Sequence, residues 1–320
     1  MRAFDYAIAE TREAALAAAA EGWTVKAGGV DLIDHLKERI GRSPRVVGIH
    51  ALDELRGVRA ENRGLRIGPL TTLRELGESE AVRAQLPALA QSAEEAATPQ
   101  VRARATVGGN LCQRPRCWYY RSHDYPCLKK GGGTCFAVEG ENQFHALYGE
   151  GPCHIVHPSN IAPVLVAVGA QFDLEKAGES RTVAAADFFV LPNANHRVEN
   201  VLAYEEIITA VRVPAMPDKA GYAEVRHKQS FDWPLAACAA ARHGGKWHVI
   251  LGAVAPMPWR SEHAEHVLQG VDPVDAATAE RAAEAALEGA APMSKNAWRL
   301  ALVRAAVRRA LMRAEGQEAV

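Results

Sequence analysis

The first sixty residues alternate between short apolar runs and segments with helical spacing. Residues 11–22 predict a helix whose first residue, a threonine, is its N-cap. Residues 23–29 predict a strand that ends in a glycine turn. In the following helix, up to residue 40, apolar residues recur every four positions, and we expect Asp31 to be its cap. Residues 44–49 predict a second strand, so this part of the chain predicts a right-handed parallel crossover.

The rest of the chain carries mixed patterns around one irregular stretch, residues 112–153. Before and after it we expect a half-buried strand at 64–72, helical pieces at 72–79 and 81–97, a strand entering a second glycine turn at 105–111, and an apolar helix followed by a strand at 161–175. Beyond a proline-rich boundary at 213–221 we expect strands at 221–229 and 246–255 and helices at 275–290 and 295–316.

Composition narrows the class of protein. The 320 residues are 48% hydrophobic and 23% charged with a formal net charge of −1, so no basic field favours nucleic-acid binding. Apolar runs are interrupted well before 18 residues, so we expect no membrane span. The N-terminal residues are mixed and charged, without an export signal, which predicts a cytoplasmic protein; export together with a signal-bearing partner is the alternative.

The cysteines are concentrated in the irregular stretch. They are Cys112, Cys117, Cys127, Cys135 and Cys153, with only Cys238 elsewhere. The gaps between Cys117, Cys127, Cys135 and Cys153 are nine, seven and seventeen residues. This spacing fits neither the short knuckles of a structural zinc site nor the tighter runs of bacterial ferredoxins. Four separated thiolates suit a loop around an iron–sulfur cluster, and Arg114, Arg116, Lys129 and Lys130 would offset its negative charge. Another metal site, two disulfides or free buried thiols remain alternatives.

Two glycine turns could bind an anion. Residues 27–32 place Gly28 and Gly29 between a strand and a helix, where backbone N–H groups and the helix dipole meet. Residues 106–110 repeat the arrangement. Each turn alone also fits an ordinary tight connection, but the two together favour a ligand with two phosphates. No hydrolase, kinase or Walker motif accompanies them.

Four motifs in order resemble a known family. "AGGVDL", "LRIGPLTTLREL", "ATVGGNL" and "HPSNIAPVLVAVGAQF" are similar to the FAD-binding subunit of the xanthine dehydrogenase and molybdenum hydroxylase group. The resemblance runs from about residue 3 to the C-terminal helices. About forty inserted residues with four cysteines resemble the insertion of 4-hydroxybenzoyl-CoA reductase and periplasmic aldehyde oxidoreductases, which holds a [4Fe–4S] cluster.

The resemblance implies an α+β fold in two domains. Residues 1–216 would form a two-part FAD-binding domain of the vanillyl-alcohol-oxidase (PCMH) type, divided into a βαβ subdomain at 1–60 and a second subdomain at 61–216. The second subdomain would contain the cluster insertion at about 112–155. Residues 217–320 would form a small domain of sheet and helices, of the CO-dehydrogenase flavoprotein type.

The resemblance also implies the site residues. Asn160 stands where the family has an aspartate, and Glu224 stands where we expect a lysine, whose contact Lys228 would take over. Cys112 is expected to be a packed thiol near the flavin. The residues implied for FAD are Thr24, Val25, Lys26, Ala27, Gly28, Gly29, Val30, Asp31, Leu32, Thr106, Gly108, Gly109, Asn110, Asn160 and Lys228. Those implied for the cluster are Cys117, Cys127, Cys135 and Cys153.

The implied function is that of an oxidoreductase subunit which transfers electrons through FAD and a [4Fe–4S] cluster. Its partners would be a large molybdopterin subunit, a small [2Fe–2S] subunit and an external electron acceptor or donor. No residue of this chain would act on the substrate, which would be an aldehyde, an N-heterocycle or an aromatic acyl-CoA. The alternatives are a stand-alone flavin oxidase or dehydrogenase, a zinc-stabilised binding module without redox activity, and an insertion that serves only for docking.

Overall fold

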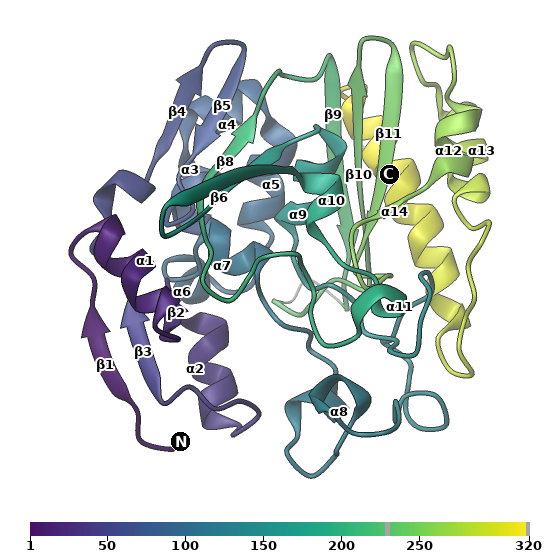
Figure 1. The fold of residues 1–320 in the computed structure, drawn as a ribbon. Coiled ribbons are helices and arrows are strands. Elements are labelled where there is room, and N and C mark those ends of the chain that lie inside the picture. The colour runs from purple at the N-terminus through teal and green to yellow at the C-terminus, as the bar shows by residue number, and fades with distance from the viewer. Residues whose placement is uncertain (228–230, 318–320) are drawn as a thin grey trace.

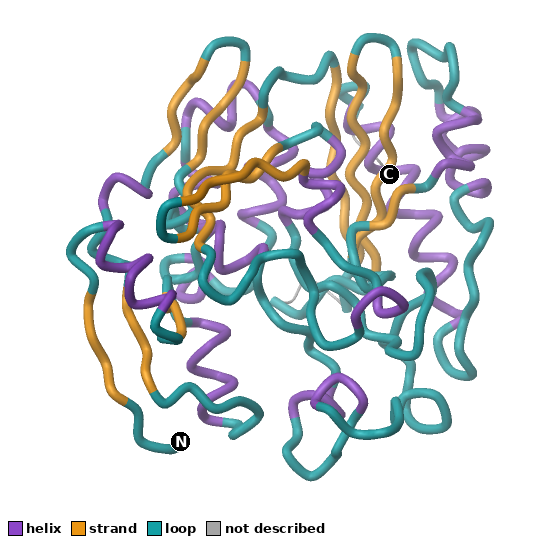
Figure 2. Tube along the Cα trace, viewed as in Figure 1, coloured by secondary structure: helices purple, strands orange, loops and turns teal. Residues whose placement is uncertain are grey.

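The computed structural model describes residues 1–227 and 231–317, and these form three β-sheets with helices packed against them (Figures 1 and 2). Lys228, one of the expected flavin contacts, lies outside the described residues. Within the described residues, no helix combines the length and the apolar character needed to cross a bilayer.

The N-terminal subdomain is the predicted crossover. Strand β3 pairs in parallel with β2 and with a further strand, β1. The pattern did not predict β1 because all four of its residues are exposed. Thr11 caps the first helix as predicted, its side chain accepting a hydrogen bond from the backbone N–H of Ala14. The elements are β1 (Asp5–Ile8), α1 (Arg12–Ala20), β2 (Thr24–Lys26), α2 (Val30–Lys37), β3 (Arg45–Gly48) and the 3-10 helix η1 (Asp53–Leu55).

The predicted cap of α2 is wrong. The helix begins at Val30, and its N-cap is Gly29, which adopts the left-handed conformation with φ +81°. Asp31 therefore lies inside the first turn, and its carboxylate accepts hydrogen bonds from distant arginines instead of from its own backbone.

The second subdomain surrounds an antiparallel five-stranded sheet with strand order β4-β5-β8-β6-β7. Helices α5 and α9 contact one another and extend to the C-terminal sheet, so one hydrophobic core runs from this sheet into the next domain. The elements are β4 (Val58–Glu61), β5 (Gly64–Ile67), α3 (Leu73–Glu78), α4 (Glu80–Gln85), α5 (Pro87–Glu94), α6 (Pro99–Arg102), α7 (Val107–Leu111), α9 (Ile161–Ala167), β6 (Gln171–Lys176), β7 (Glu179–Ala184), α10 (Ala185–Phe188), α11 (Pro192–Asn195) and β8 (Ile207–Val213).

The strand predicted at 105–111 is also wrong, because α7 occupies this segment. Thr106 is the N-cap and accepts a hydrogen bond from the backbone N–H of Gly109 at 3.2 Å. Capping by a threonine side chain thus outweighs the apolar character that favoured a strand.

The cysteine segment lies between the N-terminal subdomain and the C-terminal domain, at the foot of Figure 1. It contains little regular structure, as the sequence predicts. Its elements are the single-turn helix α8 (Trp118–Arg121) and the 3-10 helix η2 (Leu128–Lys130).

The C-terminal part is an antiparallel sheet with strand order β12-β11-β10-β9, and α14 packs across β9 and β10. Gly221 allows the close approach, because a Cβ there would lie 2.1 Å from the carbonyl oxygen of Ala310. The elements are β9 (Lys219–Val225), β10 (Ala236–His243), β11 (Lys246–Gly252), β12 (Trp259–Arg260), α12 (Glu262–Val267), α13 (Ala276–Ala285), η3 (Ala297–Arg299) and α14 (Leu300–Ala314).

Candidate functional site

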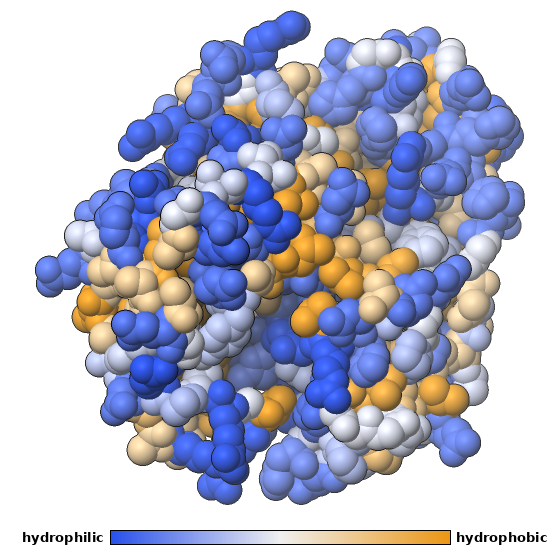
Figure 3. Space-filling model, viewed as in Figure 1, coloured by the Kyte–Doolittle hydropathy of each residue, from blue (hydrophilic) through white to orange (hydrophobic). Residues whose placement is uncertain are grey.

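A cavity of about 300 Å³ is lined by nearly all the expected FAD residues, and Figure 3 shows a recess between the N-terminal subdomain and the centre of the molecule. Of the expected residues that the structure describes, only Thr24 does not line the cavity. Its hydroxyl lies 3.1 Å from that of Tyr204. The expected residues that line the cavity are Val25, Lys26, Ala27, Gly28, Gly29, Val30, Asp31, Leu32, Thr106, Gly108, Gly109, Asn110 and Asn160. We refer to it below as the flavin cavity.

The two glycine turns meet at one end of this cavity. A Cβ on Gly28 would lie 1.9 Å from the carbonyl oxygen of Arg104, so the first turn contacts the chain just before the second turn. The eight-residue helix α2 starts here, with a glycine N-cap and no side chain over its first N–H groups. Free N–H groups at the positive end of a helix dipole bind phosphate, so this end fits the pyrophosphate of FAD.

The flavin cavity also contains residues that were not expected to contact FAD. Gln113, Arg116 and Trp233 line it together with Cys112. The guanidinium of Arg116 lies over the Trp233 ring, 4.6 Å from its centroid. Burial, helped by the nearby Glu199, raises the pKa of the Cys112 thiol to about 12, so this thiol stays protonated. No sequence motif marks Trp233 as a cavity residue, because its segment is far from the glycine turns along the chain.

The four expected cluster ligands line a second, much smaller cavity. We call it the thiol cavity, and aromatic residues and His145 enclose it. The thiols of Cys135 and Cys153 are joined by a hydrogen bond, which lowers the pKa of Cys135 and raises that of Cys153. All six cysteines are free, so the disulfide alternative is not seen. The residues of the cavity are Cys117, Tyr119, Tyr120, Cys127, Leu128, Lys129, Cys135, Phe136, His145, Cys153 and Ile155.

The thiols surround this space instead of converging on a point. Among the described residues, no group of three or more histidine, cysteine, aspartate or glutamate side chains is placed to hold a metal ion. A mononuclear zinc site would need four ligands at about 2.0 to 2.3 Å from one centre. Four cysteines around one space offer one thiolate for each iron of a four-iron cluster.

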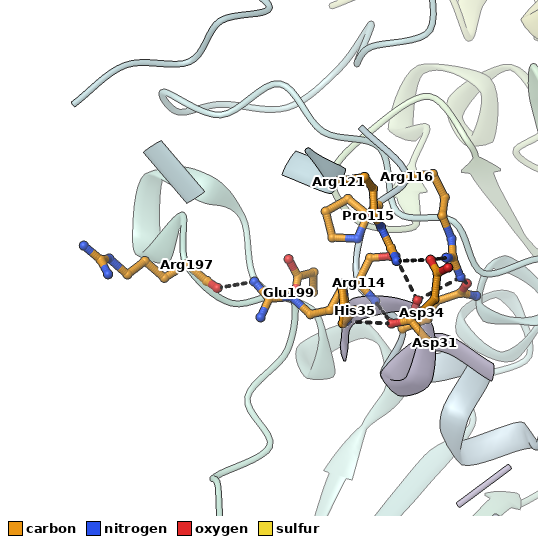
Figure 4. A network of polar contacts seen from close by, with 10 residues as sticks. Asp31, Asp34, His35, Arg114, Pro115, Arg116, Arg121, Arg197 and Glu199 are labelled. Atoms are coloured by element: carbon orange, nitrogen blue, oxygen red, sulfur yellow. Dashed lines mark hydrogen bonds and ion pairs between the residues drawn. The ribbon is translucent and has the colours of Figure 1, made fainter. Parts of the chain in front are cut away.

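Ion pairs join the two cavities (Figure 4). The Asp31 carboxylate accepts hydrogen bonds from the backbone N–H of Arg114 at 2.9 Å and from Arg121 at 2.8 Å, and it pairs with Arg116 at 3.0 Å. Arg121 also pairs with Asp34 at 2.8 Å. Burial alone would raise the pKa of Asp31, but Arg116, Arg121 and the backbone hydrogen bond lower it, so this carboxylate is ionised. We call these five residues the arginine–aspartate clamp.

A second buried ion pair also fixes the cysteine segment. Lys129 lies 2.6 Å from Glu199, which Arg114 also contacts at 2.6 Å, and the side chains of Lys129 and Glu199 are almost fully buried. Lys130 donates a hydrogen bond to the carbonyl oxygen of Tyr119 at 3.0 Å. The four basic residues expected to offset a cluster are thus present, but three of them are paired with carboxylates.

Two adjoining cavities, one bordered by two glycine turns and one lined by four thiols, suit a flavin-binding redox protein. The chain belongs to the family of FAD-binding subunits of molybdopterin dehydrogenases, because the family model described as FAD binding domain in molybdopterin dehydrogenase matches residues 2–216. The model of the CO dehydrogenase flavoprotein C-terminal domain matches residues 222–314. The predicted family and α+β fold class are therefore confirmed, and the chain is an oxidoreductase subunit.

Related proteins and a solved structure support the same family. The chain is 32% identical over 325 residues to the aldehyde oxidoreductase FAD-binding subunit PaoB of Escherichia coli K12, covering 99% of this chain and 100% of that protein. It is 30% identical over 251 residues to the carbon monoxide dehydrogenase medium chain of Hydrogenophaga pseudoflava, covering 76% and 71%. A solved carbon monoxide dehydrogenase from that organism superposes with a TM-score of 0.75 at 26% identity, covering 98% of both chains.

Proposed function

We propose that this chain carries electrons between FAD and a [4Fe–4S] cluster held by Cys117, Cys127, Cys135 and Cys153. The observation that supports it is the adjacency of the two cavities: Arg116 lines the flavin cavity, and the next residue, Cys117, lines the thiol cavity. Electron exchange between two cofactors requires such proximity, and the arginine–aspartate clamp keeps the two segments together.

The chain's own residues bind, orient and shield the cofactors. When bound, FAD exchanges electrons with an external partner, and the cluster adds a further electron carrier. The N–H groups at the start of α2 would bind the pyrophosphate, whereas those of residues 107–110 already donate to Thr71, Pro69 and Thr106 within the protein. Around the thiols, Tyr119, Phe136 and Ile155 exclude water, which keeps the cluster environment apolar.

The partners and substrates follow from the relatives. We propose a complex with a large molybdopterin subunit and a small [2Fe–2S] subunit, with the substrate bound on another chain. The relation to an aldehyde oxidoreductase subunit over the full length supports an aldehyde as substrate. More distant relatives named for caffeine and nicotine support an N-heterocycle as the second candidate. An aromatic acyl-CoA as substrate is supported only by the resemblance of the cysteine segment to the insertion of 4-hydroxybenzoyl-CoA reductase.

The test is to quantify flavin and iron in the anaerobically purified full-length chain and to record its ultraviolet–visible spectrum. We expect one FAD and about four irons per chain. Cys135→Ser should lose iron and keep FAD, whereas the control Cys238→Ser, in strand β10 and away from the thiol cavity, should keep both. A chain that holds one FAD and no iron, or zinc in place of iron, would overturn the proposed cluster. A folded chain that takes up no FAD would overturn the whole proposal.

A further inference from the structure

Asn160 connects the flavin cavity to a buried carboxylate outside it. The residue lines the cavity, is only 4% exposed and directly precedes α9. Its amide nitrogen donates a hydrogen bond to Glu224 Oε2 at 2.7 Å. Glu224 lies on β9, and its side chain is 2% exposed. A cofactor-facing side chain is thus held by a residue that does not itself line the cavity.

The surroundings of Glu224 determine which end of the Asn160 amide faces it. Tyr222 donates its hydroxyl to Oε2 at 2.6 Å, and Arg226 donates to Oε1 and also pairs with Glu95 at 3.8 Å. Burial raises the pKa of Glu224, against the hydrogen bond from Tyr222 and the charge of Arg226, which lower it. When ionised, Glu224 only accepts hydrogen bonds, so Asn160 must turn its NH₂ group toward it. The amide oxygen Oδ1 is then the atom that Asn160 can offer to a ligand in the cavity.

The identities of both residues differ from those that the family resemblance implies. An aspartate is expected at 160 and a lysine at 224, whereas this chain has an amide and a carboxylate in direct contact. An aspartate would bring a negative charge to the cavity. Asn160 brings a hydrogen-bond acceptor without that charge, and a nearby negative charge disfavours the addition of electrons to a flavin.

We propose that Glu224 is a positioning residue for the flavin: it orients the amide of Asn160 so that the cavity offers the cofactor a neutral hydrogen-bond acceptor. The inference rests on the proposed placement of FAD in this cavity. It implies that Asn160 and Glu224 act as one unit, so that neither residue can be changed alone without loss, whereas exchanging the amide and the carboxylate preserves the contact.

Three variants of the full-length chain test the proposal. In Glu224→Gln the oxygen of the new amide faces Arg226, which can only donate, so its NH₂ group faces Asn160. Asn160 must then turn its oxygen to Gln and offer NH₂ to the cavity. We expect a rise of about tenfold in the Kd for FAD, equivalent to one lost hydrogen bond. Asn160→Asp places two carboxylates in contact and should weaken FAD binding further. The double variant Asn160→Asp/Glu224→Gln restores a donor–acceptor pair, and its Kd should return to within about threefold of the original.

The readouts are FAD fluorescence titration of the deflavinated chain and the midpoint potential of the bound flavin. The double variant should bind FAD well but have a lower midpoint potential, because a carboxylate now faces the cofactor. Thermal unfolding of the FAD-free variants shows whether each is folded. An unchanged Kd and potential in Glu224→Gln, or a double variant that shows the sum of both losses, would overturn the proposal.

A control separates this proposal from the placement of FAD. Gly28→Val inserts a side chain against the Arg104 carbonyl oxygen, where even a Cβ would lie at 1.9 Å, and should abolish FAD binding. If it does so while Glu224→Gln changes nothing, only the positioning role fails. If Gly28→Val binds FAD like the unmodified chain, FAD lies elsewhere, and the positioning role fails with its premise.

Discussion

The arginine–aspartate clamp predicts that Asp31→Asn destabilises the chain far more than the same change at the neighbouring Asp34. The Asp31 side chain is 17% exposed and receives three polar contacts at 2.8 to 3.0 Å from the cysteine segment. The Asp34 side chain is 46% exposed and contacts Arg121 at 2.8 Å and Arg116 at 3.7 Å. Both positions lie on α2, so intrinsic helix propensity affects the two variants alike; only Asp31 lies in the first turn, where the helix dipole adds about 0.3 to 1 kcal/mol to the effect of its charge.

The magnitude follows from the burial of the arginines. Removing one partner of a buried ion pair costs about 3 to 5 kcal/mol, because the remaining charge is left buried without compensation. In Asp31→Asn, Asp34 still compensates part of the charge on Arg121 and Arg116, so we expect the lower end of that range, about 3 kcal/mol. For Asp34→Asn, the carboxylate that is removed is half exposed, and Asp31 still neutralises the arginines, so we expect a loss of less than about 1 kcal/mol.

Urea unfolding followed by circular dichroism measures both variants against the unmodified chain. The experiment should be done without FAD and again at saturating FAD, because a change in FAD affinity would also change the apparent stability. An equal loss for Asp31→Asn in both conditions assigns the effect to the clamp. A loss within about 0.5 kcal/mol of that of Asp34→Asn would refute the reasoning, since the buried contacts of Asp31 would then carry no more free energy than the exposed ones.

Two further predictions concern buried polar residues. Arg299 is 1% exposed and donates to the carbonyl oxygens of Leu235, His145 and Ala253, so Arg299→Met should lower the free energy of unfolding by about 3 kcal/mol. The control is Arg304→Met, because the Arg304 side chain is half exposed. Equal urea midpoints for the two variants would contradict the prediction. Burial lowers the pKa values of His35 and His157 to about 4, so the unfolded chain takes up these protons first as the pH falls. The free energy of unfolding should therefore decrease as the pH is lowered from 6.5 to 4, by up to roughly 3 kcal/mol per histidine, and these residues should not affect it above pH 6.5. If the urea midpoint of His157→Gln falls on acidification as steeply as that of the unmodified chain, the prediction is contradicted.

The sequence predicted the elements whose signals are local. The crossover, the Thr11 cap and the apolar helix α9 each depend on side chains within a few residues of one another. Strand β10, in contrast, was missed: six of its eight residues are buried, five of them alanines, so it carries neither the alternation nor the β-branched residues typical of strands. It is a strand because both neighbouring strands pair with it.

The residues of the candidate site likewise divide into those with a local sequence signal and those whose role depends on the fold. The glycine turns and the cysteines could be found from the sequence because spacing and residue type carry their chemistry. The role of Asp31 could not, since its partners Arg114, Arg116 and Arg121 lie more than eighty residues away, and a local cap was the simplest interpretation of an aspartate at a helix start. Glu224 was noticed only as a departure from the family; its contact with Asn160 depends on the packing of α9 on the C-terminal sheet to which β9 belongs.

The cysteine segment is fixed from two sides by groups that are not cofactor ligands. On the flavin side it is held by Asp31, Asp34 and Glu199. On the C-terminal side, Asn296 donates to the carbonyl oxygens of His145 and Ala146 at 3.0 and 3.1 Å, and Arg299 donates to that of His145 at 2.6 Å. Because these contacts involve no thiol, the protein can set the separation of the two cavities whether or not the thiols hold a cluster. A cysteine variant that loses iron should therefore keep its FAD, whereas loosening the clamp should disturb the spacing between the cofactors even with all four cysteines present.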